Sequence, residues 1–447
     1  MASASSSRSV TQKTSLKRNA DHLEEVSAST STTKVAKVFP IFSKPQASDF
    51  QWAKPLGRSG TCLHGVNLAP KLHAKVAAFD LDGCLIESSF GKKQDPSTFK
   101  WWRPIVPNKL KSLYEEGYTI VIFTNQALRG DKAIDNWKKK IPYIASALSE
   151  VPFHLYAATA KNGYRKPMPG MWYALEALFR EDGVTIDSDK SFFVGDAAGR
   201  AGDFASTDRK LALNIGIPFS TPEEYFLGLP AAPYKLPGFN VSTLPTNRSY
   251  NSEVHLTILL IIISVPSYTP SSTPLVPTNG AQEIVLFAGM PSLGKTSFFK
   301  KHFEPAGYIH VNQDTLKSRD KCIKRVEQVM KEGRSCVVDN TNRDQVTRKY
   351  YIDLSQRHRV PIRCILFEGS IELAWHNNLY RAFNMPPGSK QPKRDLLPYS
   401  AFTNFKSMFE APKMSEGFKE IKTVNWVFEG SEEERRRWSM WLQIDGK

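Results

Sequence analysis

Short apolar runs alternate with longer mixed segments in two stretches of this chain. The runs of the first stretch lie at 76–79, 118–123 and 191–194. Those of the second stretch lie at 284–288, 335–338 and 363–367. Each run has the length of a strand buried on both faces, and the segments between them are long enough for helices. The pattern predicts two α/β domains, each with a parallel sheet.

Two segments depart from this alternation. Residues 1–66 are rich in Ser, Thr, Ala and Lys without a sustained period, which predicts a disordered basic tail. Residues 230–280 have the Pro, Ser and Thr content of a linker. The two α/β domains are therefore expected at 67–229 and 281–447.

An apolar segment, Leu256–Val265, interrupts the linker. As a helix its ten residues would extend about 15 Å, half of a bilayer core of about 30 Å. We therefore expect no membrane crossing. The alternatives are a strand and an insertion outside the fold, and an exposed run of this kind favours aggregation.

Charge and cysteine content narrow the class of protein. Lys and Arg number 60 against 44 Asp and Glu, a net charge of +16. This excess favours a polyanionic partner, such as nucleic acid, an acidic membrane surface or a phosphorylated substrate, although a basic protein without such a partner is the alternative. The five cysteines form no CxxC pair, which argues against a disulfide framework or structural zinc and fits a reducing compartment.

Two aspartates, Asp80 and Asp82, follow the first apolar run in the sequence FDLDGC. At the end of a strand, one aspartate can attack a phosphorus centre to form an aspartyl phosphate. The second can protonate the leaving oxygen and then activate water. For this motif alone, a calcium loop or an ordinary turn is the alternative.

Three later motifs support phosphate chemistry. Thr124 and Asn125 follow the second run, where their hydroxyl and amide can hold phosphate oxygens. Lys166 can neutralise the phosphate, and Asp196 follows the third run as a further carboxylate for Mg²⁺. Because parallel strands present their carboxyl ends at one edge of a sheet, the motifs predict a single site.

The second domain opens with a phosphate-binding motif. The sequence GMPSLGKT, from Gly289 to Thr296, matches GxxxxGK[ST] between a predicted strand and a predicted helix. Ser292 and Gly294 belong to the turn, whose backbone N–H groups would bind the phosphates of ATP. Lys295 would reach the β- and γ-phosphates, and Thr296 would bind Mg²⁺. A glycine turn that arose by chance is the alternative.

Phosphoryl transfer also needs a base and a closing cation. Asp314, in HVNQDTLKS, and Asp339, in VVDNTN, are candidates for orienting the acceptor or holding the hydration shell of the metal. Each aspartate could instead cap a helix. The candidate cations are Arg381 first, and then Arg343, Arg348 and Arg394.

The first set of motifs resembles the haloacid dehalogenase superfamily of phosphatases. A second acidic residue near Asp196 is common in that superfamily, and Asp208 is preferred here over Asp203. Cys84 stands where the superfamily usually has Thr. The resemblance implies these roles: Asp80 as nucleophile, Asp82 as acid and base, Thr124 and Lys166 at the phosphate, and Asp196 at Mg²⁺ together with Asp80 and Asp82.

Both sets of motifs together resemble the eukaryotic polynucleotide kinase 3′-phosphatase family, over about residues 68–235 and 281–430. The resemblance implies removal of 3′-phosphates and ATP-dependent phosphorylation of 5′-hydroxyls at DNA breaks. The tail is too short and too polar for the forkhead-associated domain of mammalian members, and Leu379 stands where many relatives have an arginine. The run FKWWRP, at 99–104, would either stack on unpaired bases or pack in the core.

We therefore expect a monomeric, Mg²⁺-dependent enzyme that acts on DNA ends, uses ATP and meets other repair proteins. The N-terminus has no apolar signal region, and Lys17-Arg18 fits either a nuclear import signal or a solvated basic tail. Nuclear residence is expected, with mitochondrial residence open. The alternatives are a small-molecule phosphatase fused to a metabolite kinase, and a repair scaffold whose sites have decayed.

Overall fold

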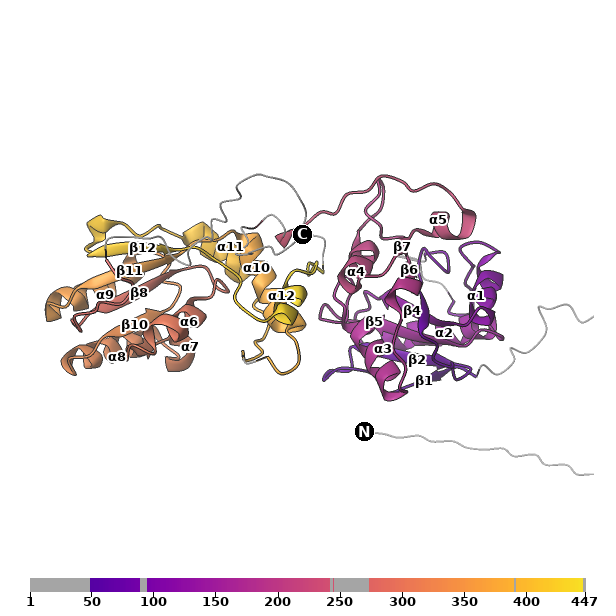
Figure 1. Ribbon diagram of the computed structural model, residues 1–447, viewed down its shortest axis with the longest axis horizontal. Helices are drawn as coiled ribbons and strands as arrows, with labels where there is room; N and C mark the ends of the chain where they lie inside the picture. Colours follow the sequence, from indigo (N-terminus) through magenta and orange to yellow (C-terminus); the bar gives the residue numbers. More distant parts are fainter. Residues whose placement is uncertain (1–48, 89–94, 242–243, 245–272, 390, 445–447) are drawn as a thin grey trace, which may run out of the picture. The chain divides into compact units, whose positions relative to one another are not determined.

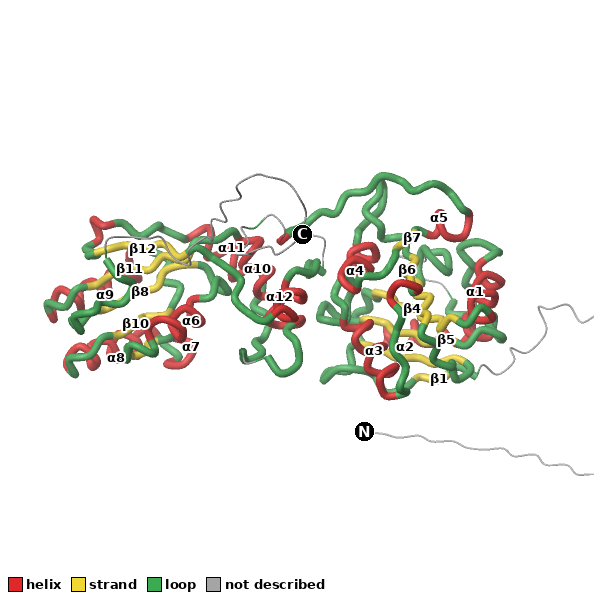
Figure 2. Tube along the Cα trace, in the orientation of Figure 1, coloured by secondary structure: helices red, strands yellow, loops and turns green. Residues whose placement is uncertain are grey.

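The computed structural model describes residues 49–88, 95–241, 244, 273–389 and 391–444. These residues form two β-sheets with helices packed on them, one within 51–220 and one within 284–424 (Figures 1 and 2). The prediction of two α/β folds is confirmed. The apolar segment Leu256–Val265 and the first 48 residues lie outside the described residues.

The first sheet has seven strands in the order β1-β2-β5-β4-β3-β6-β7. Strands β3 to β7 are parallel, whereas β2 runs antiparallel to both β1 and β5. The strands are β1 Gln51–Trp52, β2 Cys62–Asn67, β3 Lys75–Phe79, β4 Tyr118–Asn125, β5 Phe153–Ala158, β6 Phe192–Val194 and β7 Phe219–Ser220. The helices are α1 Val106–Glu115, α2 Asp131–Ser146, α3 Gly170–Glu181, α4 Thr207–Ile215 and α5 Pro222–Leu227, with a 3-10 turn at Ser188–Lys190.

Helices cover both faces of this sheet, which is why its parallel strands read as continuous apolar runs. On one face, Leu110 of α1 and Ile144 of α2 pack in a core cluster with Phe79. On the other face, Leu175 of α3 and Leu211 of α4 belong to a separate cluster. The interior of β4 is buried along its whole length.

The expected boundary between tail and first domain is wrong. Strands β1 and β2 lie within the predicted tail, and Cys62 of β2 pairs with Ala158 of β5. These strands contain no apolar run, because they are antiparallel and β2 includes His64 and Gly65. Gly65 is required there, since a Cβ at this position would overlap the buried Phe50 ring.

The second sheet has five parallel strands in the order β12-β11-β8-β10-β9. Its strands are β8 Ile284–Gly289, β9 Ile309–Val311, β10 Cys336–Asp339, β11 Ile362–Phe367 and β12 Glu420–Val424. Its helices are α6 Lys295–Phe298, α7 Gln313–Leu316, α8 Arg319–Lys331, α9 Gln345–His358, α10 Ile371–Leu379, α11 Tyr399–Met408 and α12 Glu432–Trp438. Shorter turns are π-helical at Phe299–Phe303 and Tyr380–Asn384 and 3-10 at Met414–Glu416.

A buried ion pair fixes the end of the linker to this second sheet. Arg363 donates to both carboxylate oxygens of Glu283 at 2.6 Å, and Glu283 also accepts from the hydroxyl of Tyr308 at 2.6 Å. The same guanidinium donates to the carbonyl of Leu275 at 2.9 Å. Leu275 is buried in the second domain's core, so this fold begins before the expected residue 281. Among the described residues, no helix is long and apolar enough to cross a membrane.

Candidate active sites

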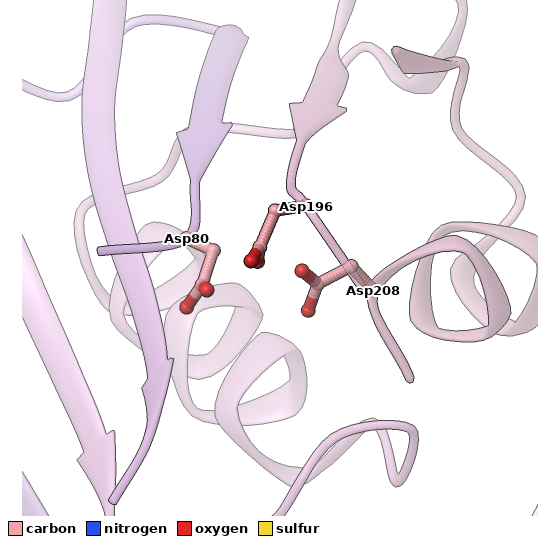
Figure 3. Close-up of side chains that lie close together, drawn as sticks. All are labelled: Asp80, Asp196 and Asp208. Carbon is pink, nitrogen blue, oxygen red and sulfur yellow. The ribbon is translucent and has the colours of Figure 1, made fainter. Parts of the chain in front are cut away.

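Three carboxylates meet at one edge of the first sheet. Asp80 follows β3, Asp196 follows β6, and Asp208 lies in the first turn of α4. Because β3 and β6 are adjacent and parallel, their carboxyl ends lie side by side. One oxygen from each side chain lies within 4.8 Å of the others, and Figure 3 shows the three pointing into a common space. We call Asp80, Asp196 and Asp208 the carboxylate cluster.

Lys166 is buried against this cluster. Its ammonium lies 2.6 Å from Asp80 Oδ1 and 2.8 Å from Asp208 Oδ1, and it donates to the carbonyl of Phe123 at 2.8 Å. Burial opposes the charge on Lys166, but Asp208 and Asp80 outweigh it and raise the pKa of the lysine. Lys166 therefore stays protonated, with its charge aimed at two of the three carboxylates.

Asn125 and Thr124 lie at the end of β4, beside this lysine. The Asn125 side chain donates to the carbonyl of Lys166 at 3.0 Å and accepts from its N–H at 2.9 Å. Asn125 thus holds the Lys166 backbone beside the predicted phosphate position. The buried hydroxyl of Thr124 accepts from Gln126 Nε2 at 2.9 Å.

Asp82 lies next to the cluster but outside it. Its Oδ2 accepts from Gln126 Nε2 at 2.8 Å, and burial first, then the charge of Asp80, raises its pKa. This shift is toward the protonated form, which is the form that can donate a proton. Gln126 was not among the predicted site residues, because its role depends on the packing of β4 against the turn after β3.

The turn that carries Asp82 is tightly fitted. Gly83 has φ of 85°, and a Cβ there would overlap the Asp196 carboxylate. The buried thiol of Cys84 donates to the carbonyl of Val194 at 3.4 Å. A threonine hydroxyl could make the same bond, so Cys84 supports the loop in the way expected for the residue usual at this position.

The cluster has a local excess of negative charge that suits a divalent cation. Burial first, then the charges of Asp80 and Asp208, raises the pKa of Asp196 to about 8. Among the described residues, the buried Asp196 Oδ1 has no hydrogen-bond partner. Three carboxylates facing one ammonium, with an unbonded oxygen among them, form the oxygen-rich environment that Mg²⁺ prefers. The structure brings Asp208, and neither Asp82 nor Asp203, into this cluster.

The second domain presents its motif between β8 and α6, as the phosphate-binding pattern requires. Ser292 and Gly294 adopt left-handed φ values of 64° and 83°, and the ammonium of Lys295 donates to the carbonyls of Gly289 and Met290 at 2.9 and 2.7 Å. Burial lowers the pKa of Lys295 to about 8. In contrast to Lys166, Lys295 bonds only backbone carbonyls here.

Thr296, the last residue of this loop, is hydrogen-bonded to Asp339. The Thr296 hydroxyl donates to Asp339 Oδ2 at 2.7 Å, and His310 Nε2 lies 2.9 Å from the same oxygen. Although burial opposes it, these two bonds hold the pKa of Asp339 below its usual range. The His310 ring stacks on Phe299 with centroids 4.2 Å apart. His310 was not predicted, because β9, which carries it, has only three residues.

Asp314 lies on the short helix α7 and is exposed. The helix is capped by Asn312, whose side chain accepts from the Asp314 N–H at 2.8 Å, so Asp314 itself is not the cap. Its charge raises the pKa of Lys295, opposing burial, which places Asp314 near the loop. A polar pocket lies beside α7, lined by Gln313, Arg319, Asn340, Thr341, Asn342, Arg343, Thr347 and Tyr351.

The candidate cations differ clearly in their surroundings. Arg381 lies in a π-helical turn and lines an aromatic pocket with Ser292 and Gly294 of the loop. Burial first, then the charge of Arg394, lowers the pKa of Arg381 to about 10. Arg348 is fully buried and bonds both oxygens of Glu416 at 2.7 and 2.8 Å, so it is a structural residue.

Leu379 and the run 99–104 both contact the hydrophobic core. Leu379 is 1% exposed, so an unpaired cation at this position would be buried. Within the run 99–104, Trp101 and Trp102 are partly buried against the first core cluster, and Arg103 lies over the Trp102 ring at 4.6 Å. The two rings pack against the core, as one of the two alternatives expects, and remain partly exposed.

Each of the two domains matches a family of known proteins. Residues 75–226 match the family described as polynucleotide kinase 3 phosphatase, and residues 284–412 match the family described as AAA domain. The two matches are separate in sequence and follow the order of the two sheets.

Relatives match across both domains. The chain is 37% identical over 373 residues to a bifunctional polynucleotide phosphatase/kinase of Schizosaccharomyces pombe, which covers 83% of each protein. A putative bifunctional polynucleotide phosphatase/kinase of Acanthamoeba polyphaga mimivirus is 33% identical over 83% of this chain and 90% of its own. A polynucleotide 3′-phosphatase of Arabidopsis thaliana is 40% identical over 179 residues, 36% of this chain and 25% of that protein.

Proposed function

Because the chain belongs to the family of bifunctional polynucleotide phosphatase/kinases, we propose that it heals DNA breaks by hydrolysing 3′-phosphates and phosphorylating 5′-hydroxyls with ATP. The observation that supports this most is the presence in one chain of two unlike phosphate sites: the carboxylate cluster with Lys166, and the loop that carries Lys295. Together they convert the two ends of a break into ends that can be joined.

At the first site, Asp80 is the nucleophile. Its oxygen attacks the phosphorus of the 3′-phosphate to form an aspartyl phosphate, while Asp82 gives its proton to the departing 3′-oxygen. Asp82 then takes a proton from the water that hydrolyses this intermediate. The raised pKa of Asp82 supports the first of these steps. Lys166, with Thr124, balances the charge of the phosphate.

A magnesium ion fits the same site. Asp80, Asp196 and Asp208 would hold it, and the unbonded Asp196 Oδ1 supports this assignment. The ion would supply positive charge that draws the dianionic phosphate to a site already holding three carboxylates. Asn125 acts indirectly, by holding the backbone at Lys166.

At the second site, ATP binds with its phosphates on the loop from Gly289 to Thr296. The N–H groups of the loop and of the first turn of α6 bind the phosphates, and Lys295 moves from its backbone carbonyls to the β- and γ-phosphates. Thr296 and Asp339 would hold a magnesium ion there. The pocket that Arg381 lines also contains Trp426 and Phe428, whose rings suit the base of ATP.

The acceptor strand enters on the side of Asp314. This carboxylate is exposed, so it can accept the proton of a 5′-hydroxyl as the oxygen attacks the γ-phosphate. Arg319 and Arg343 line the polar pocket next to it and suit a phosphate of the incoming strand. Arg381, with Arg394, supplies positive charge to the phosphoryl group in transfer.

A small-molecule phosphatase fused to a metabolite kinase is not favoured, because the relatives that match over both domains are named for polynucleotides. We further propose a nuclear monomer that works with other repair proteins. Each catalytic set lies within a single chain, which supports the monomer, and Lys17-Arg18 supports nuclear import. Light scattering of the purified protein and imaging of a fluorescent fusion test these two points.

The function is tested on a nicked duplex with a 3′-phosphate and a 5′-hydroxyl. With ATP and Mg²⁺ the protein should make the nick a substrate for DNA ligase, and with Mg²⁺ alone it should remove only the 3′-phosphate. Hydrolysis of a small phosphate monoester without any action on the nick would contradict the proposal and favour the small-molecule alternative.

A further inference from the structure

One aromatic side chain projects into solvent from the segment that connects two members of the carboxylate cluster. Phe204 is 86% exposed, more than any other large apolar residue that the structure describes. It lies in the loop that joins Asp196 to Asp208, two members of the cluster. A single exposed apolar residue is ordinarily unremarkable on a protein surface, so its position and the build of its loop decide whether it has a role.

The loop around Phe204 is tightly bonded from within. The Asp203 carboxylate accepts from the N–H groups of Ala198 and Arg200 at 3.2 and 3.0 Å and from the Arg200 guanidinium at 3.0 Å. The N–H of Gly199 donates to the carbonyl of Ala205 at 3.1 Å. The residues on both sides of Phe204 are therefore held, and the ring is presented to solvent by an ordered backbone.

Neighbouring segments hold the same loop from outside. Arg200 donates to Glu223 of α5 at 2.6 Å, and the carbonyl of Gly199 accepts from the N–H of Lys235 at 2.8 Å. The guanidinium of Arg209 lies over the Tyr234 ring at 3.8 Å. A loop braced on two sides does not fold the ring back onto the core, so Phe204 stays available to a ligand.

The chain itself limits how far Phe204 can lie from the carboxylate cluster. Phe204 precedes Asp208 by four residues, which separates their Cα atoms by at most about 14 Å. A strand whose 3′-phosphate lies at Asp80 brings its last few bases within reach of this ring. Aromatic side chains next to a phosphate site are the groups on which unpaired bases stack, and such stacking tolerates any sequence.

We propose that Phe204 is the base-stacking residue of the phosphatase site: it stacks on an unpaired base within the last few nucleotides of a strand whose 3′-phosphate is in the cluster. The inference rests on the proposed removal of 3′-phosphates and assigns part of the substrate recognition.

The test compares Phe204→Ala with Phe204→Trp on a single-stranded oligonucleotide bearing a 3′-phosphate. Phe204→Ala should raise KM by roughly 5- to 150-fold, the range that stacking on one base provides, with kcat little changed. Phe204→Trp should keep KM near that of the unsubstituted protein. Leu213→Ala removes another exposed apolar side chain of the same domain, 53% exposed on α4, and should change nothing.

Abasic substrates identify the stacked base. Each of the last three nucleotides is made abasic in turn, and at one position the difference between Phe204→Ala and the unsubstituted protein should disappear. Hydrolysis of p-nitrophenyl phosphate, which has no nucleobase, should be equal in all variants.

Three results would overturn the assignment: an unchanged KM in Phe204→Ala, the same KM ratio on every abasic substrate, or a matching loss on p-nitrophenyl phosphate. The last would mean that the ring only supports the loop. If the unsubstituted protein hydrolyses p-nitrophenyl phosphate but no 3′-phosphorylated strand, the proposed function itself fails, and that outcome is distinct from the other three.

Discussion

Both phosphate sites lie at the carboxyl ends of parallel strands, each in its own sheet, yet their lysines have different kinds of partner. Lys166 lies against Asp80 and Asp208 at 2.6 and 2.8 Å, and these partners raise its pKa. Lys295 bonds only the backbone carbonyls of its loop, and burial lowers its pKa to about 8. The first site is electrostatically assembled before substrate arrives, whereas the second requires the phosphates of ATP to complete it.

This difference follows from the chemistry proposed for each site. A site that forms a covalent aspartyl phosphate needs its nucleophile fixed, and Lys166 fixes Asp80. A site that transfers a phosphoryl group directly between two bound molecules needs mainly to position the reacting groups of those molecules. Removing each lysine should therefore have unlike consequences.

The largest expected effect is that of Lys166→Met, which keeps the length of the side chain but removes its charge. Phosphatase kcat should fall by about 10³-fold or more, because phosphate and nucleophile both lose their cation. The free energy of unfolding should drop by about 3–5 kcal/mol, since Asp80 and Asp208 are left buried without a cation to balance their charges. Urea unfolding and steady-state assays measure both. Unchanged stability would show that the lysine is not needed to assemble the cluster.

The matched change, Lys295→Met, should affect catalysis alone. Kinase kcat should fall by about 10²- to 10³-fold, because a cation at the transferred phosphoryl group is lost. The free energy of unfolding should change by no more than about 1 kcal/mol, since the buried Asp339 loses the nearby charge of Lys295 but keeps its bonds to Thr296 and His310. A loss of stability as large as that of Lys166→Met would remove the contrast between the two sites.

A smaller effect is expected for His310→Ala. His310 bonds Asp339 and orients the carboxylate that would hold Mg²⁺, so kinase activity should fall by about 10- to 100-fold and recover partly at high Mg²⁺. His310→Asn, which can still donate to Asp339, should lose less. A phosphatase assay on the same variants is the folding control, and a loss there would indicate damage to the protein as a whole.

The mildest perturbation, which replaces no residue, is a change of pH, and it should alter the stability of the metal-free protein. The folded pKa of Asp196, about 8, is above that of the unfolded chain, so between about pH 4 and 8 the folded state binds the extra proton. Stability should therefore decrease as pH rises through this window, by up to about 1.4 kcal/mol per pH unit for one proton. Urea titrations in EDTA at pH 5 and 7.5 measure this decrease. Asp196→Asn or added Mg²⁺ should reduce it, and Asp208, whose pKa burial raises to about 6, should supply part of what remains. An equal decrease in Asp196→Asn would assign it elsewhere.

Sequence was sufficient for the parts of the molecule that are local in the chain. The parallel strands are buried on both faces, so β4 and β8 appear as apolar runs, and the motifs at their ends predict which side chains reach the sheet edge. Asp208 was also proposed, although only the packing of α4 against β6 brings it to Asp80. These residues are fixed by topology that the strand–helix alternation already implies.

Other features depend on contacts that spacing does not encode. Strand β2 runs antiparallel to its neighbours, near one edge of the sheet. Because it contains no apolar run, its sequence predicts part of the tail. Asn125 was proposed at the phosphate, but its amide is occupied by the backbone of Lys166, 41 residues away. The sequence offers Arg348 as a possible catalytic cation, whereas its ion pair with Glu416 makes it a structural residue. Long-range partners decide the role of each of these side chains.

The central claim is that one chain carries two independent phosphate sites that together heal a DNA end. The most direct measurement follows both end groups of a single nick, with 3′-phosphate and 5′-hydroxyl, in the presence of ATP and Mg²⁺. Asp80→Asn should leave the 3′-phosphate in place while the 5′-end is phosphorylated, and Lys295→Met should do the reverse. A mixture of the two variants should restore ligation. Loss of both activities in either variant, or survival of both, would contradict the account.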